Sequence, residues 1–219
     1  MAIDKTNPEN KNKALGHLWF EVEMLNKSLV IRDEFSITDE SKIDFEIKLN
    51  DAFRSSCDDN FLLHLRNIID FLKKFEMNSD GDYIIECGCG NKIKRNDKNM
   101  YKDEFFPEEE YDEINKLIKP ITNYDLSNVS SGLTINNLNR QMAHLSWKRV
   151  DRDRIKNPPW AHHAKTIQKL VNERMKEFFE ELLKLSSDFK IIKENSEEIP
   201  LKNIIDYLDN KIKEAGRSD

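Results

Sequence analysis

The sequence contains few of the residues that interrupt helices and few that could cross-link the chain. Glycine and proline number six each among 219 residues, and there are three cysteines. Few helix breakers together with many Lys, Glu, Leu and Ile residues favour a mostly helical protein. Three cysteines are an odd number and too few for a disulfide scaffold, so we expect free thiols.

Long apolar runs and an excess of positive charge are missing as well. No apolar stretch approaches the roughly 20 residues that a membrane-spanning helix needs. Residues 1–13 carry no apolar core of a signal peptide, so we expect a cytoplasmic protein with no membrane partner. The formal net charge of −6 at pH 7 argues against passive binding of nucleic acid, but it does not exclude a local basic cleft.

The composition is sufficient for one domain with a substantial core. Hydrophobic residues make up 38% of the chain and charged residues 35%. We interpret residues 1–219 as a single helical domain with flexible termini at 1–12 and 214–219. Residues 78–102 interrupt the helical pattern as an insertion. The predicted fold class is all-α, a helical bundle with one small inserted β-hairpin at about 82–95.

Apolar residues repeat at three- and four-residue steps in several stretches, as on one face of a helix. Polar residues Cys57 to Asn60 are expected to end one helix and cap the next. The polar segment that follows Pro120, up to Leu133, is interpreted as a loop. The predicted helices span residues 13–30, 40–56, 61–75, 107–120, 135–149, 160–185 and 196–212.

The insertion contains two strand-like pieces and two cysteines. Tyr83–Glu86 and Lys92–Lys94 are separated by turn-forming residues, which is typical of a hairpin. Cys87 and Cys89 lie at its turn, where two thiolates could join a zinc site or form a redox pair. Zinc prefers four ligands and no second ligand pair lies nearby, so a plain turn is the simpler interpretation. We predict no metal and no cofactor.

The stretch from Ile135 to Arg149 carries the main candidate site. On a helical wheel its apolar residues form one stripe, and Arg140 and His144 lie on roughly the opposite side, one turn apart. These two are the candidate catalytic residues. The stripe consists of Ile135, Leu138, Met142 and Leu145. Candidate substrate-binding residues around the pair are Asn137, Trp147 and Arg149.

Two further candidates for substrate binding lie in the strongly apolar 61–75 helix. His64 and Arg66 flank its apolar stripe on opposite edges. Arg66 and Asp70 are four residues apart and should pair if they are exposed. If Arg66 is buried it needs a partner, because an unpaired buried charge is costly. That partner could be structural or could belong to a site.

Three pieces of the sequence together resemble a known family: HLWFEVEML at 17–25, LLHLRNIIDFL at 62–72 and INNLNRQMAHLSWKR at 135–149. They are similar to bacterial all-helical proteins of the HEPN type, and the resemblance covers about residues 13 to 149. It implies a bundle of four to five helices, often a homodimer. It also implies a ribonuclease of a toxin–antitoxin or phage-defence system. The family motif is an arginine, four to six residues and a histidine, whereas three residues separate Arg140 from His144.

The chemistry implied is metal-independent cleavage of RNA. Histidine can move a proton near neutral pH, and arginine can hold a phosphate through two hydrogen bonds. The alternative is structural: Arg140 could pair with a carboxylate, and His144 could bond a backbone carbonyl inside the bundle. The chain would then be a non-catalytic helical protein that dimerises or binds a protein partner. A weaker third interpretation is a metal or redox protein that uses Cys87 and Cys89.

Overall fold

The computed structural model describes residues 7–34, 44–73, 75–77, 83–86, 92–94, 100–129, 134–135, 163–193 and 195–216. This part of the chain is mostly helical, as predicted, and none of its helices is both long enough and apolar enough to cross a membrane. Its α-helices are α1 (Pro8–Glu34), α2 (Asp44–Phe71), α3 (Tyr111–Leu117), α4 (Asn123–Val129), α8 (Ala164–Leu185) and α9 (Leu201–Ala215). Two short 3₁₀ helices, η1 (Lys102–Phe105) and η2 (Glu108–Glu110), precede α3.

Helix α1 begins at Pro8, earlier than the expected Lys13, so residues 8–12 are helical rather than part of a flexible terminus. The side chain of Asn7 caps the helix, because its Oδ1 accepts the backbone N–H of Glu9 at 2.9 Å. Pro8 then occupies the first helical position, where its missing N–H costs nothing. A capped first turn explains why the helix extends beyond its apolar pattern.

Helix α2 runs without interruption through residues 57–60, so the predicted break there is wrong. Cys57 is buried, and the carboxylate of Asp58 forms an ion pair with Arg32 of α1 at 2.8 Å. These contacts with α1 stabilise helical backbone in a stretch whose residues would otherwise favour a cap. The contacts also show that α1 and α2 are antiparallel, since Arg32 meets Asp58 while Glu21 meets His64.

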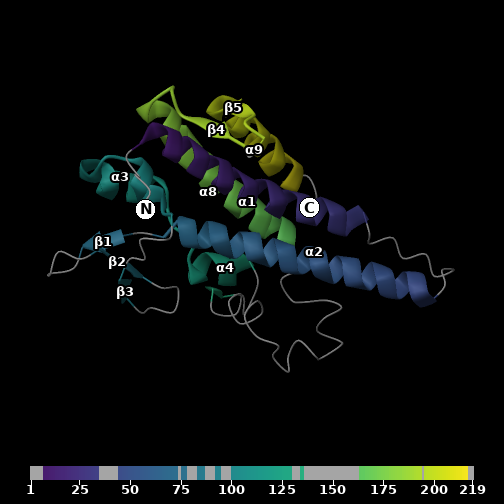
Figure 1. Cartoon of the computed structure of the whole chain (residues 1–219). Coiled ribbons are helices and arrows are strands. Elements are labelled where there is room, and N and C mark those ends of the chain that lie inside the picture. The colour runs from purple at the N-terminus through teal and green to yellow at the C-terminus, as the bar shows by residue number, and fades with distance from the viewer. Residues whose placement is uncertain are drawn as a thin grey trace.

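The core lies where α1, α2 and α8 come together, with α9 packed on α8 (Figure 1). Phe178 of α8 is fully buried and meets the edges of Phe71 and Phe105 with ring centroids 5.0 and 5.6 Å apart. A buried amide cluster joins α1 to α8. Oδ1 of Asn26 accepts hydrogen bonds from Gln168 at 2.7 Å and from Asn172 at 3.0 Å.

The inserted hairpin is confirmed. Strands β2 (Tyr83–Glu86) and β3 (Lys92–Lys94) pair antiparallel, with Ile85 opposite Ile93. The sheet has a third strand, β1 (Phe75–Met77), which pairs with β2. The predicted 61–75 helix extended into β1, because antiparallel pairing with the neighbouring strand β2 makes these residues a strand.

A second hairpin was not predicted. Strands β4 (Lys190–Ile192) and β5 (Glu198–Pro200) pair antiparallel, so the helix expected to begin at 196 begins only at Leu201. Pro200 has φ −60° and ψ 141°, an extended conformation that a helix interior does not allow. Ile191 is fully buried, and β4 packs on α1. The hairpin is thus fixed by contact with a helix far away in the sequence.

Helix α4 replaces part of the loop expected after Pro120. The Oγ1 of Thr122 accepts the N–H of Asp125 at 3.2 Å, while the Asp125 carboxylate accepts the N–H of Thr122 at 2.8 Å. This reciprocal arrangement is a capping box, and its T-x-x-D signature is present in the sequence. Leu126, one turn into the helix, is fully buried.

Candidate functional site

Five of the seven predicted site residues lie outside the described residues, as do both cysteines of the insertion. The five are Arg140, His144, Asn137, Trp147 and Arg149, and the cysteines are Cys87 and Cys89. The structure therefore bears directly on His64, on Arg66 and on the first residue of the stretch that carries the others.

That first residue, Ile135, is helical and only 5% exposed. It belongs to the same apolar core as α1, α2 and α8. Its backbone N–H donates to Oδ1 of Asn123 at 2.8 Å, which links the start of this stretch to the start of α4. The first member of the predicted apolar stripe therefore faces the protein interior.

His64 of α2 is buried, and its imidazole is held by Glu21 of α1. Its Nδ1 lies 2.6 Å from Oε2 of Glu21 on α1, and the same oxygen accepts Nδ2–H of Asn67 at 3.0 Å. Because an ionised carboxylate can only accept, the close contact assigns a proton to Nδ1 of the imidazole. The ring of Phe20 meets the imidazole edge-on, with centroids 5.9 Å apart.

The other nitrogen, Nε2 of His64, has no hydrogen-bond partner within the described ranges. An imidazole fixed by a carboxylate at one nitrogen can accept or donate a proton at the other, which is how orienting groups are used in catalysis. The same contact also satisfies a buried histidine that has only a structural role. Both the chemical and the structural interpretation fit this geometry.

Arg66 is only partly buried and pairs within its own helix. Its Nε lies 3.8 Å from Oδ2 of Asp70, the i, i+4 pair expected from the sequence, and Lys73 pairs with the same carboxylate. The side chain of Arg66 is 39% exposed, so this is a surface ion pair that contributes little to the free energy of unfolding. The structure does not bring Arg66 into contact with the group around His64.

Sequence reasoning missed a buried cation. Lys102 of η1 is completely buried, and its Nζ donates to Oδ1 of Asn115 at 2.6 Å and to the carbonyl of Ile118 at 3.0 Å. The carboxylate of Asp103 is 4.0 Å away and is also buried. A buried ammonium needs such partners to offset its lost hydration. We therefore interpret the contacts of Lys102 as structural contacts that link η1 to α3.

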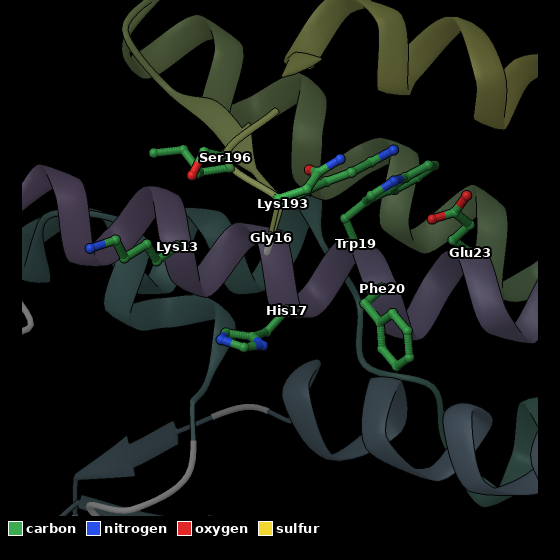
Figure 2. Close-up of a pocket in the computed structure, with 10 residues that line it drawn as sticks. Lys13, Gly16, His17, Trp19, Phe20, Glu23, Lys193 and Ser196 are labelled. Atoms are coloured by element: carbon green, nitrogen blue, oxygen red, sulfur yellow. The ribbon is translucent and has the colours of Figure 1, made fainter. Parts of the chain in front are cut away.

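A pocket of about 440 Å³ lies on the outer face of α1, beside the turn of the β4–β5 hairpin (Figure 2). We refer to it as the α1 pocket. It could not be expected from the sequence, because one of its sides is the unpredicted hairpin. Helix α1 contributes Lys13, Gly16, His17, Trp19, Phe20 and Glu23, and the hairpin contributes Ile192, Lys193, Asn195 and Ser196.

The thiol of Cys57 is poorly suited to chemistry. Burial raises its pKa, and the neighbouring Asp58 carboxylate raises the pKa further, while Arg32 lowers it. The reactive form of cysteine is the thiolate, so a raised pKa makes Cys57 a weak nucleophile at neutral pH. Among the described residues, no group of three or more His, Cys, Asp or Glu side chains is arranged to hold a metal ion.

No protein-family model, no curated protein and no solved structure matches this chain.

Proposed function

We propose that this chain is a HEPN-like, metal-independent endoribonuclease, or a component derived from one, of a bacterial toxin–antitoxin or phage-defence system. Arg140 and His144 are its proposed catalytic residues. Asn137, Trp147 and Arg149 would bind RNA beside them. The proposal starts from the sequence pattern of residues 135–149, and the structural support for it comes from the residue where that pattern begins.

The burial of Ile135 is the observation that carries the proposal. Successive residues of an α-helix are rotated by about 100°. If the predicted helix continues from a buried Ile135, its apolar stripe faces the core, and Arg140 and His144 are directed away from it. A cation and an imidazole one turn apart on an outward face are available to a substrate or to a second subunit.

The chemistry assigned to the two residues needs no metal. RNA can be cleaved by attack of the ribose 2′-hydroxyl on the adjacent phosphate, which requires proton transfer and stabilisation of negative charge. His144 would transfer the proton, since imidazole titrates near neutral pH. Arg140 would hold the phosphate oxygens as charge builds up on them. In a dimer, two copies of the helix could line one groove.

The test is an RNA-cleavage assay with the purified protein, with and without EDTA. We expect cleavage that EDTA does not abolish and that falls by at least about a hundredfold in His144→Ala and Arg140→Ala, the usual scale for loss of an acid–base group. His163→Ala is the matched control, because His163 is an exposed histidine at the start of α8. Absence of cleavage, or equal cleavage by His144→Ala and the parent protein, would contradict the proposal.

The second candidate is a non-catalytic protein that dimerises or binds a protein partner. It is favoured by apolar side chains that the α1–α2 pair leaves exposed, namely Val30 at 46%, Ile31 at 39% and Leu63 at 39%. Exposed apolar side chains of this kind can be buried when a second subunit or a protein partner binds. A stable dimer with no activity on RNA would favour this function.

A further inference from the structure

The α1 pocket is built on a direct backbone contact between a helix and a hairpin. A Cβ atom at Gly16 would lie 2.0 Å from the carbonyl oxygen of Ile192, so only glycine allows β4 to come this close. After β4, the backbone N–H of Ser196 donates a hydrogen bond to the carbonyl of Lys193 at 2.9 Å. Ser196 adopts φ 64°, a conformation that few residues other than glycine take up. These contacts fix the positions of β4 and Ser196 at the rim of the pocket.

Aromatic groups and an unused donor line the pocket. Phe20 is 53% exposed, which is unusual for so large an apolar side chain. Trp19 is only 5% exposed and its ring meets Tyr207 edge-on, yet nothing in the described chain accepts a hydrogen bond from its indole N–H. Figure 2 shows Trp19 on the hairpin side of α1 and Phe20 on the other side. The exposed ring of Phe20 is thus the surface in the pocket on which a planar ligand can stack.

The described lining of the pocket includes two lysines and one carboxylate. Lys13 and Lys193 line it, and each pairs with an exposed carboxylate, that of Glu9 and that of Glu197 respectively. Exposed ion pairs of this kind are weak, so a bound phosphate could take over either ammonium group at little cost. Among the described lining residues the carboxylate is that of Glu23, and it pairs with a lysine outside the pocket at 2.9 Å.

We propose that the α1 pocket binds one nucleotide, either free or as an unpaired residue of single-stranded RNA. The base would pack against the exposed ring of Phe20, and the phosphate would lie near Lys13 and Lys193. A volume of about 440 Å³ suits a ligand of this size and not a folded partner. The RNA form of this proposal rests on the proposed function, whereas the described lining of the pocket comes from α1 and the β4–β5 hairpin.

The test measures binding separately from cleavage, in the His144→Ala background. Adenosine and uridine monophosphates are titrated by calorimetry, and a fluorescent single-stranded oligonucleotide by anisotropy. We expect Phe20→Ser to weaken the Kd by about tenfold or more, since loss of one stacked base has an effect of that order. Lys193→Glu should weaken binding as well, and higher salt should weaken it further.

Two matched variants control for surface changes that do not touch the pocket. Tyr124→Ser removes a 73% exposed aromatic ring from α4, and Lys184→Glu removes an exposed lysine that pairs with Glu181 on α8. Both should bind like the parent, and thermal denaturation should show all four variants folded. If neither probe binds, or if the controls weaken binding as much as the pocket variants do, the inference is wrong.

The outcomes separate this inference from the proposed ribonuclease. Saturable binding of the monophosphates or the oligonucleotide that pocket variants weaken supports the inference, even if the parent protein never cleaves RNA. Binding of the monophosphates alone assigns the pocket to a free nucleotide, and binding of the oligonucleotide alone assigns it to RNA. Cleavage of RNA with binding unchanged in the pocket variants supports the enzyme and overturns the nucleotide pocket.

Discussion

At the scale of single residues, His64 is the predicted site residue that the structure shows buried. Its Nδ1 is held by Glu21 at 2.6 Å, and the side chain is 8% exposed. Replacing it with leucine leaves the Glu21 carboxylate without its imidazole partner. We expect His64→Leu to lower the free energy of unfolding by roughly 1–3 kcal/mol, the usual cost of removing one partner of a buried hydrogen bond. Urea denaturation followed by circular dichroism measures this change.

A second substitution at the same residue separates structure from chemistry. Asn places an amide nitrogen where His has Nδ1, so His64→Asn can still donate to Glu21 but has no Nε2. We expect its stability to stay within about 1 kcal/mol of the parent. If RNA cleavage then falls while stability holds, Nε2 takes part in the reaction. The exposed His17→Leu change on α1 is the control and should leave stability nearly unchanged.

At the scale of elements, Gly16 decides whether α1 and the β4–β5 hairpin can meet. Alanine is the better helix former by about 1 kcal/mol, so Gly16→Ala would stabilise an isolated helix. Here its Cβ would overlap the Ile192 carbonyl, and the clash with rigid backbone outweighs the gain. We expect a net loss of roughly 1–3 kcal/mol, as for other overpacked sites, measured as a lower urea midpoint. The exposed Lys27→Ala on the same helix should change little, and a stabilised Gly16→Ala would contradict the observed packing.

The same elements show what the sequence could predict. The long helices could be expected because their apolar residues repeat with helical period, and the first hairpin because turn residues separate two short strands. Strands β1 (Phe75–Met77) and β4 (Lys190–Ile192) could not, since three residues carry too short a pattern and become a strand only by pairing with a neighbouring strand. Two local signals were available but not used: the lone Gly16 inside a helical pattern indicates close backbone approach, and Thr122 with Asp125 indicates a helix start.

The candidate site was less predictable than the fold for a physical reason. Residue type and spacing can place Arg66 and Asp70 on one helix face, and that pair is present. They cannot place Glu21 beside His64, because the two residues come from different helices and meet only through tertiary packing. The α1 pocket depends on the same kind of long-range contact, here between Gly16 and the backbone of β4. A site whose residues come from several helices and strands can therefore be recognised only once the fold is known.

At the scale of the whole molecule, we propose a homodimer. Substitution of exposed apolar residues on α1 and α2 tests this proposal. Ile31 of α1 and Leu63 of α2 are each 39% exposed. We expect sedimentation equilibrium to give twice the chain mass of 25.9 kDa for the parent. The double variant Ile31→Ser, Leu63→Ser should form a weaker dimer, with a much higher dissociation constant, because burial of apolar area drives association.

The matched double variant Leu117→Ser, Leu183→Ser removes exposed leucines from α3 and α8 and should dimerise like the parent. A monomeric parent, or equal weakening by both double variants, would contradict a dimer that buries Ile31 and Leu63. The measurement also bears on catalysis. If Arg140 and His144 from two subunits form one groove, cleavage per chain should fall on dilution in step with the loss of dimer. Cleavage that is independent of dissociation would instead place the complete reaction within a single protomer.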